Sequence, residues 1–323
     1  MNAKNFWLLA VVTLCSAIAT QTTEAQTRPV TRDTSFRVVG YLPDYRVEAI
    51  DSAVGRHLTD LVFFSVKPTP TGQFESKTLD DAKTKSLLKR FRDEHGVKIH
   101  LCVGGWDRSQ GFAEIAATVE SRRLFAKGLL AFCRQHHFDG ADLDWEHPKD
   151  DTESKNYGAL LSEIARAFKP HKLRLTAAMA AWQTLTAEGI AAVDAIHLMS
   201  YDNPGRHSTF ETAQADVAKF RKLGVPAGKL CLGLPFYGRG ITAGDQAKTY
   251  SEIVSPARLA LETDEADGLF FNGPATIRKK TQFAIEQKLG GVMVWEIGQD
   301  AKGDASLLRV IDEAKTGAKR LPK

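Results

Sequence analysis

Residues 138–146 read Phe-Asp-Gly-Ala-Asp-Leu-Asp-Trp-Glu and combine a strand pattern with a row of acids. Between Gly140 and Glu146 apolar and acidic residues alternate, and a period of two is typical of a β-strand. The apolar side would pack against helices, whereas the other side places Asp142, Asp144 and Glu146 along one line, roughly 7 Å apart. Because like charges at that separation make each ionisation harder, stability alone would not favour this row.

The segments on either side of the acidic row decide between two interpretations of it. A solvated edge strand would tolerate acids. Residues 122–135 and 154–168, however, both have helical spacing, which favours a buried parallel strand between two helices. Acids at the carboxyl end of such a strand indicate a catalytic site.

Eight segments of the chain have strand patterns, and segments of helix length separate most of them. The expected strands are Arg37–Tyr41, Asp60–Val66, Lys98–Val103, Gly140–Glu146, Arg174–Met179, Ala195–Tyr201, Lys229–Leu234 and Gly291–Trp295. The expected helices are Asp80–Glu94, Arg122–Gln135, Glu153–Phe168, Glu211–Leu223, Ala275–Lys288 and Ala305–Ala314. Several strands are almost continuously apolar, as in strands buried on both faces. We therefore predict the α/β class and a single (β/α)8 TIM barrel over residues 36–318, rather than a doubly wound sheet.

The acidic row also carries a resemblance to a known family. Asp139, Asp142, Asp144 and Glu146 form the pattern Asp-x-x-Asp-x-Asp-x-Glu, which resembles the signature of glycoside hydrolase family 18. That family contains chitinases and endo-β-N-acetylglucosaminidases on a (β/α)8 barrel. The resemblance extends over nearly all of the mature chain, from Val38 to Trp295 and the closing helix, and so includes the loops after the other strands.

Loops after the expected strands hold further residues that the resemblance assigns to substrate. Gly104-Gly105-Trp106 follows the third strand: the glycines let the backbone approach a ligand closely, and the Trp offers a flat face to a sugar ring. On its own, this motif fits a tight turn with a packed Trp better. The family usually has Ser where this chain has Cys102, a weaker hydrogen-bond donor to the acidic row. Tyr41, at the end of the first strand, is assigned to substrate binding as well.

Met199-Ser200-Tyr201-Asp202 resembles the family's Met-x-Tyr-Asp motif. Alternation places Met199 and Tyr201 on one face of the sixth strand and Asp202 at its end. A tyrosine near acids is more often a packed, hydrogen-bonded residue, but the acidic row in the same chain favours a catalytic role. His207, in the loop that follows, either contacts substrate or lies on the surface.

Two further segments resemble the family near the end of the chain. Residues 233–238 read Gly-Leu-Pro-Phe-Tyr-Gly, similar to the family's Gly-x-Pro-x-Tyr-Gly run, and are expected to shape a bend at the barrel mouth. Arg239 directly after this run is expected to reach a sugar hydroxyl. Trp295 ends the eighth strand, where the family uses a Trp as the floor of the cleavage subsite; core packing is the alternative. Asp139 and Gly140, which precede the acidic row, are assigned structural positions.

The resemblance implies hydrolysis of a β-1,4 bond at N-acetylglucosamine with retention of configuration. Glu146 would be the general acid and base, while the acetamido oxygen of the substrate attacks C1, an exception to the scheme with two carboxylates. Asp144 would orient the acetamido group, and Asp142 would share a proton with it so that the row never carries three charges. Tyr201 would bond the acetamido carbonyl, and Asp202 would position the sugar. No metal and no organic cofactor is implied.

Other functions are weighed against this one. The sequence has no Gly-x-Ser-x-Gly, phosphate-loop, Cys-x-x-Cys or His-Glu-x-x-His pattern. A formal net charge of +4 is too slight to indicate nucleic acid. We expect a monomer that binds chitin or another N-acetylglucosamine polysaccharide, without nucleic acid or stable membrane association. The alternatives are an endo-β-N-acetylglucosaminidase on N-glycans, a peptidoglycan or spore-coat hydrolase, a non-catalytic chitin-binding lectin and a structural barrel.

The first 25 residues resemble a secretory signal peptide. Lys4 supplies the positive charge, Phe6–Ala19 the apolar run, and cleavage is expected after Ala25, followed by a disordered lead-in at 26–35. Cys15 follows Leu14 rather than a small residue, which disfavours a lipid anchor. A secreted or periplasmic enzyme is therefore expected. Its three remaining cysteines lack framework spacing and are expected as buried free thiols: Cys102, Cys133 and Cys231.

The connection between the seventh and eighth strands is expected to be short. Many family members insert a small α+β domain here, but residues 240–289 also have to supply a helix. About 30 residues remain, fewer than the roughly 50 of a small domain. Residues 250–261 are expected to form one short helix, and residues 262–273 an acidic loop. The prediction is a low wall, an open groove and an endo-acting, weakly processive enzyme.

Overall fold

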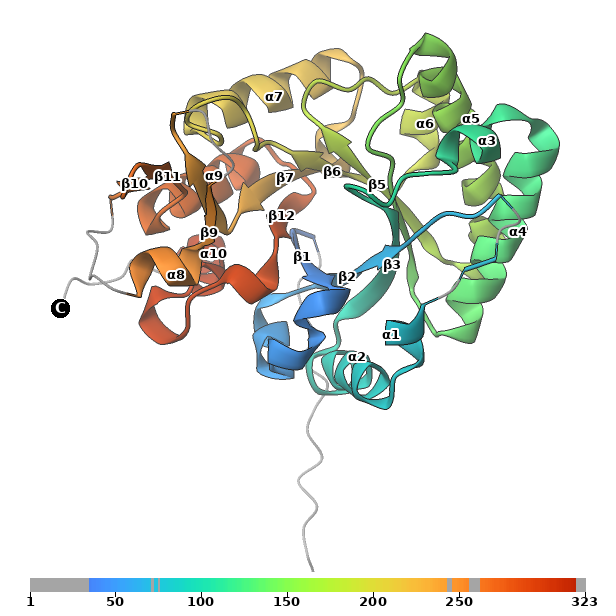
Figure 1. Ribbon diagram of the computed structural model, residues 1–323. Helices are drawn as coiled ribbons and strands as arrows, with labels where there is room; N and C mark the ends of the chain where they lie inside the picture. The colour runs from blue at the N-terminus through green and yellow to red at the C-terminus, as the bar shows by residue number, and fades with distance from the viewer. Residues whose placement is uncertain (1–34, 71–72, 75, 243–245, 256–261, 318–323) are drawn as a thin grey trace, which may run out of the picture. The chain divides into compact units, whose positions relative to one another are not determined.

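A computed structural model describes residues 35–70, 73–74, 76–242, 246–255 and 262–317 of the chain. Eight parallel strands close into a barrel in the order β1-β12-β7-β6-β5-β4-β3-β2 (Figure 1). Their bounds are β1 Arg37–Pro43, β2 Asp60–Val66, β3 Lys98–Gly104, β4 Gly140–Asp144, β5 Arg174–Ala180, β6 Ala195–Met199, β7 Leu230–Pro235 and β12 Gly291–Trp295. The predicted (β/α)8 barrel is confirmed, and the doubly wound alternative is wrong because β1 pairs with both β2 and β12.

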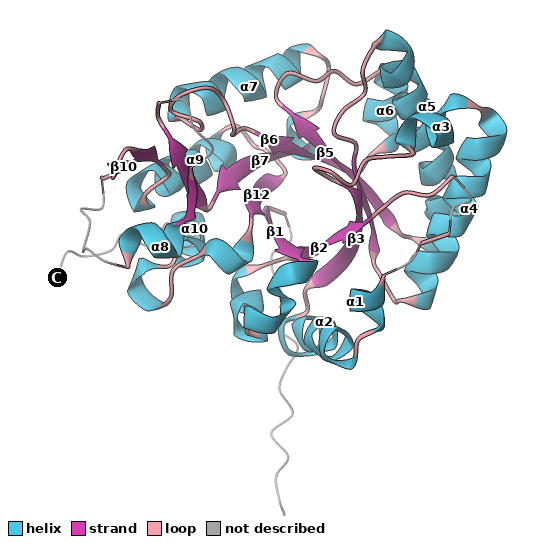
Figure 2. Ribbon diagram, in the orientation of Figure 1, coloured by secondary structure: helices cyan, strands magenta, loops and turns pink. Residues whose placement is uncertain are grey.

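Helices surround the barrel strands on the outside (Figure 2). They are α1 Lys77–Asp80, α2 Ala82–His95, α3 Phe112–Ala117, α4 Val119–Gln135, α5 Asp151–Phe168, α6 Ala187–Ala192, α7 Phe210–Lys222, α9 Pro274–Glu286 and α10 Leu307–Thr316. Short 3₁₀ helices cover Asp44–Ala49, Ser52–His57, Lys169–His171, Ala227–Lys229, Ile297–Gln299 and Gly303–Ala305. The six predicted helices are all present. The short α1, α3 and α6 were not predicted, because four to six residues give too few turns for a periodic pattern.

The strands separate two packed regions. Side chains on the outer face pack against the helices; on β4 these are Ala141 and Leu143, followed by Trp145, whose ring stacks on Phe112 with centroids 5.4 Å apart. Inside the barrel lies a smaller apolar cluster of Val39, Tyr41, Val62, Phe64, Cys102, Ala195, Cys231 and Met293. The acidic row therefore enters an interior that is otherwise mainly apolar. Cys102, Cys133 and Cys231 are buried and free, as predicted.

A small second sheet lies between β7 and β12 in the chain. Its antiparallel strands have the order β10-β11-β8-β9, with bounds β8 Tyr237–Gly240, β9 Ala247–Thr249, β10 Glu265–Ala266 and β11 Leu269–Phe270. α8, Tyr250–Val254, follows β9 and matches the start of the predicted short helix, while residues 256–261 lie outside the described residues. The predicted acidic loop over 262–273 is wrong. Asp267 and Gly268 both have positive φ, 50° and 75°, and form a two-residue hairpin turn between β10 and β11.

Residues 1–34 are outside the described part, so the expected signal peptide and nearly all of the expected lead-in are not among the residues seen in the structure. Within the described residues, no helix combines the length and the apolar character needed to cross a bilayer.

Candidate active site

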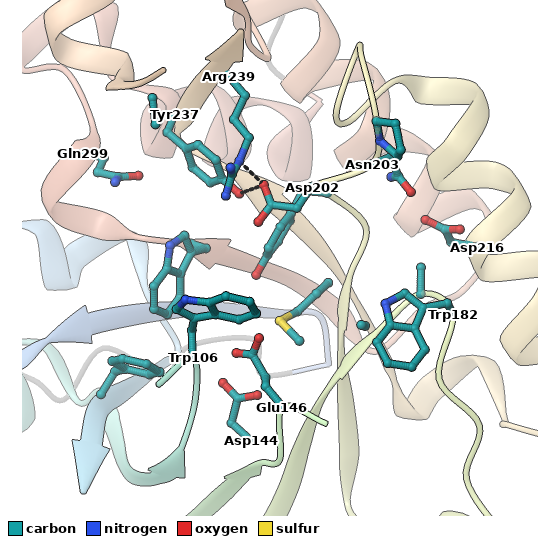
Figure 3. Close-up of a pocket in the computed structure, with 18 of the residues that line it drawn as sticks. Trp106, Asp144, Glu146, Trp182, Asp202, Asn203, Asp216, Tyr237, Arg239 and Gln299 are labelled. Carbon is teal, nitrogen blue, oxygen red and sulfur yellow. Dashed lines mark hydrogen bonds and ion pairs between the residues drawn. The ribbon is translucent and has the colours of Figure 1, made fainter. Parts of the chain in front are cut away.

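A cavity of about 1100 Å³ opens at the carboxyl ends of the barrel strands (Figure 3). Eight of the residues that the sequence assigned to the site line it: Trp106, Asp144, Glu146, Met199, Tyr201, Asp202, Arg239 and Trp295. The small second sheet and α8 contribute Tyr237, Ala247, Lys248, Thr249 and Glu252 to the lining. The barrel and its short insertion thus share one cavity, into which the acidic row leads.

Five of the assigned residues do not line the cavity. Asp142 and Tyr41 lie beneath it, both almost fully buried. Gly105 has φ +99°, and a Cβ there would come 2.3 Å from the Phe64 ring, so it shapes the backbone. Asp139 accepts the backbone N–H of Ile99 at the opposite end of β4, and a Cβ on Gly140 would meet the Arg174 carbonyl oxygen at 2.1 Å. The assignment of Tyr41 to substrate contact is corrected accordingly: its hydroxyl lies 2.7 Å from Asp142.

The loop after β3 holds the end of β4 in place. The backbone N–H of Gly105 donates to the carbonyl oxygen of Asp144 at 2.7 Å. Ser109 Oγ lies 3.0 Å from the same oxygen and accepts the backbone N–H of Glu146 at 2.9 Å. The alternation predicted that β4 extends to Glu146. The strand ends at Asp144 instead, because the backbone from Asp144 onward bonds to this loop.

Asp142 is the fully bonded member of the acidic row. Its carboxylate accepts Thr176 Oγ1 at 2.5 Å and Tyr41 Oη at 2.7 Å, and it lies 3.1 Å from Nδ1 of His197. Burial alone raises the pKa of Asp142, but His197, Thr176 and Tyr41 together hold its pKa below the ordinary value. Thr176 and His197 were missed from the sequence, although strand alternation places both on the inward faces of β5 and β6.

Asp144 and Glu146 have fewer hydrogen-bond partners than Asp142. Burial first, then the charges of Glu146 and Asp142, raise the pKa of Asp144 well above its ordinary value. Among the described atoms, Oδ1 of Asp144 is buried without a hydrogen-bond partner. Burial and the charge of Asp202 raise the pKa of Glu146 to about 7, against the backbone N–H of Trp106, which lowers it. A carboxyl group with that pKa can give and take a proton near neutral pH.

Asp202 lies across the cavity from Glu146 and is held by three side chains. It accepts the Tyr237 hydroxyl at 2.6 Å and pairs with Arg239 Nε at 2.5 Å (Figure 3). It also lies 3.7 Å from His207 Nδ1. Burial raises its pKa, but these three partners bring the pKa below the ordinary value, so Asp202 is a carboxylate. His207 is fully buried against it, which overturns both sequence interpretations of this residue. Tyr237, expected only to shape a bend, orients Asp202 instead.

Tyr201 and Trp295 form the inner surface of the cavity. Tyr201 follows the end of β6, and its hydroxyl lies 3.9 Å from Met293 Sδ. Trp295, at the end of β12, meets Phe64 edge-on with ring centroids 4.8 Å apart and Tyr41 at 5.7 Å. Because these contacts fix the indole while it still lines the cavity, Trp295 is a rigid aromatic floor.

Exposed tryptophans mark the rim of the cavity (Figure 3). Trp106 is 70% exposed and Trp182 is 61% exposed. Trp182, on the loop after β5, was missed from the sequence, and so was His147, whose ring lies edge-on to it at 4.6 Å. His147 Nε2 is also 3.5 Å from Glu146 Oε2. Flat apolar faces beside a carboxyl pair suit the binding of sugar rings.

Among the described residues, no group of three or more His, Cys, Asp or Glu side chains is arranged to hold a metal ion.

The model of the glycosyl hydrolases family 18 matches residues 37–300. Chitinase 1 of Aphanocladium album is 28% identical over 282 residues, which cover 69% of this chain and 67% of that protein. Chitinase A1 of Niallia circulans is 35% identical over 198 residues, 48% of this chain and 28% of that protein. Among solved structures, the GH18 chitinase ChiB from the chitin utilization locus of Flavobacterium johnsoniae superposes with a TM-score of 0.78 at 30% identity, covering 88% of this chain and 94% of that one.

Proposed function

This chain belongs to the glycosyl hydrolases family 18, and on that basis we propose that it is a chitinase that cleaves β-1,4 bonds between N-acetylglucosamine units. One observation carries the proposal: Asp144 and Glu146, both with raised pKa values, lie in a cavity lined by Trp106, Trp182 and Trp295. Indole faces bind pyranose rings, and a carboxyl group with a pKa near 7 serves general acid catalysis.

Glu146 protonates the leaving glycosidic oxygen and later activates water. The nucleophile is the acetamido oxygen of the substrate, which attacks C1 and gives an oxazolinium ion with retained configuration. Asp144, whose Oδ1 has no hydrogen-bond partner in the described residues, accepts the acetamido N–H and orients it. Tyr201 donates to the acetamido carbonyl, and Trp295 holds the distorted ring from below. Asp202, held by Tyr237 and Arg239, raises the proton affinity of Glu146.

The test compares products from two substrate classes. Chitin oligomers should be cut into shorter oligomers, and a high-mannose glycopeptide should remain intact. Proton NMR of the first product should show the β-anomer, and oligomers without N-acetyl groups at the cleavage subsite should bind without being cut there. Release of glycan from the glycopeptide would move the assignment to N-glycans, initial α-product would rule out the mechanism, and binding without turnover would indicate a lectin.

We further propose endo-action, supported by the short insertion. The second sheet borders the cavity with strands of only two to four residues, a low wall compared with an independent domain. Long soluble chitosan should lose viscosity early and give mixed oligomers before the dimer accumulates. If the dimer alone appears while viscosity hardly changes, the enzyme acts from chain ends and the proposal of endo-action is wrong.

Export is proposed from the sequence of residues 1–25. Expression with the full leader should yield an extracytoplasmic protein whose first residue is Gln26. Retention of an intact amino terminus inside the cell would contradict this proposal.

A further inference from the structure

Beneath the cavity, β6 places a histidine against the first carboxylate of the acidic row. His197 Nδ1 lies 3.1 Å from Asp142 Oδ1 and 2.8 Å from the Tyr41 hydroxyl oxygen. The side chains of His197 and Asp142 are 2% and 0% exposed. Neither residue lines the cavity, so this contact acts on the reaction only through Asp144 and Glu146 above it.

The protons in this cluster can be counted. Tyr41 has one hydroxyl proton and two neighbours able to accept it, Asp142 Oδ2 at 2.7 Å and His197 Nδ1 at 2.8 Å. If Tyr41 donated to Nδ1, the unprotonated nitrogen would face Asp142 Oδ1 at 3.1 Å, lone pair against lone pair. If Tyr41 donates to Asp142 and Nδ1 carries a proton, every close contact joins a donor to an acceptor. The second arrangement is the one that leaves no repulsive contact.

In that arrangement Asp142 receives three hydrogen bonds, from Thr176, Tyr41 and His197. We propose that His197 is a positioning residue that donates its Nδ1 proton to Asp142, fixes Asp142 as a carboxylate and thereby confines the mobile proton of the acidic row to Asp144 and Glu146. This inference rests on the proposed function for its kinetic readout, but the tautomer of His197 can be observed without any turnover.

The surroundings of Asp142 support the assignment to His197. The titratable groups that face Asp142 from the packed elements are Tyr41, Cys102, Asp144, Tyr157, His197 and Cys231. Among these described groups His197 is the only base, and all the others gain negative charge when they ionise. The lowered pKa of Asp142 and the raised pKa of Asp144 agree with an anion fixed below and a neutral carboxyl group above.

The barrel offers a matched control at its other end. His100 Nε2 lies 2.9 Å from Asp60 Oδ1, and these side chains are 3% and 5% exposed. Like His197 and Asp142, this is a buried histidine beside a carboxyl group, although Asp60 also lies 3.3 Å from Arg174. Asp60 is not among the groups that shift the pKa of Asp144 or Glu146.

The kinetic experiment measures kcat/KM against pH on a soluble chito-oligosaccharide. Without the His197 donor, the Asp142 carboxylate takes up a proton more readily, so His197→Leu should move the acidic limb upward by about one pH unit. His197→Asn, which restores an N–H donor, should return the limb toward the wild-type position. Thr176→Val removes another donor from the same oxygen and should move the limb in the same direction. His100→Asn should lower the unfolding temperature and leave the limb in place.

Two results would overturn the proposal. One is an unchanged acidic limb in both His197→Leu and Thr176→Val; the other is an equal shift in His100→Asn. The spectroscopic experiment uses wild-type protein with ¹⁵N-histidine and long-range ¹H–¹⁵N correlation. Nδ1 of His197 should carry a proton, and an unprotonated Nδ1 at neutral pH would overturn the proposal even if His197→Leu prevents folding. Wild-type protein that is inactive on chitin but shows the protonated Nδ1 would instead refute the proposed function alone.

Discussion

Asp60 and Asp144 are both buried carboxyl groups inside the same barrel, at opposite ends of it. At the amino end, Asp60 accepts Thr59 Oγ1 at 2.7 Å and lies 2.9 Å from His100 and 3.3 Å from Arg174. At the carboxyl end, Asp144 has a buried Oδ1 with no hydrogen-bond partner in the described residues and acidic neighbours on both sides. Burial raises the pKa of both groups. The partners of Asp60 reverse the effect, whereas the neighbours of Asp144 increase it.

The difference shows which carboxyl group is structural and which is available for chemistry. A buried charge with good partners is satisfied in the folded state and has no reason to exchange its proton. A buried carboxyl group without partners costs stability, and this cost persists at sites where the group reacts. The residue type and burial are the same, so the environment alone assigns the roles.

The strongest test removes the proton donor above Asp144. Glu146→Gln keeps the side-chain shape but cannot donate a proton, so kcat should fall by about 10²–10⁴-fold. Unfolding temperature and binding of a chito-oligosaccharide should remain near the wild-type values, since no partner is left unpaired below. Turnover near the wild-type rate would remove Glu146 from the mechanism.

The comparison itself predicts opposite stability effects for the same substitution. Asp60→Asn removes a buried carboxylate that Thr59, His100 and Arg174 hold, and should lower the free energy of unfolding by about 3 kcal/mol at pH 7. Burial and the neighbouring acids raise the pKa of Asp144, so Asp144→Asn removes an unfavourable charge, and the free energy of unfolding should stay the same or rise while activity falls. Denaturant unfolding of the two variants in one buffer measures this. Equal destabilisation would mean that Asp144 is charged and satisfied in a way that its contacts do not show.

A third test separates stacking from the electrostatics of the row. Trp106 contacts Glu146 through its backbone N–H, and the residue as a whole is 70% exposed. Trp106→Ala should therefore raise KM about tenfold, which corresponds to about 1.4 kcal/mol of lost stacking, and leave the alkaline limb of the pH profile in place. Leu124→Ala, an exposed apolar residue on α4, serves as the control and should change neither. A shift of the limb in Trp106→Ala would show that the ring also controls the pKa of Glu146.

The sequence predicted the barrel because strand alternation and helical spacing persist over the whole chain, and β2 and β12 have the predicted bounds. The sequence-based prediction failed where contacts outside the periodic pattern determine the end of a strand or the burial of a side chain. The alternation continues through Tyr201, but β6 ends at Met199 because the N–H of Ser200 bonds to Leu198 in its own strand. Nothing in the pattern of α9 reveals that Lys280 is fully buried, where it bonds Ser208 and Asn272 and thereby fixes the loop that follows Asp202.

The acidic row was visible as a motif, but the residues that distinguish its members were not. Thr176 and His197 are ordinary strand residues in the sequence, and only the closed barrel brings both to Asp142. Tyr237 was predicted to bend the chain, yet its hydroxyl orients Asp202. The Asp-Gly pair at 267–268 is a sequence signal for a hairpin turn, and it would have predicted the pairing of β10 with β11 in the second sheet.

The smallest expected effect is the contribution of the Asp202 carboxylate, across the cavity, to the pKa of Glu146. The pKa of Glu146 is about 7, and general acid catalysis needs the protonated form, so kcat/KM should fall as pH rises through about 7. Asp202 is a carboxylate whose charge raises that pKa, and Asp202→Asn should therefore move the alkaline limb to lower pH, by less than one unit.

Asp107 acts in the same direction but more weakly, so Asp107→Asn should give a smaller shift of the same sign. Both positions have positive φ, 63° and 58°, which Asn adopts readily, so neither substitution strains the backbone. A limb that stays in place in Asp202→Asn would show that burial alone sets the pKa of Glu146, and the contrast between the two ends of the barrel would then rest on desolvation rather than on neighbouring charges.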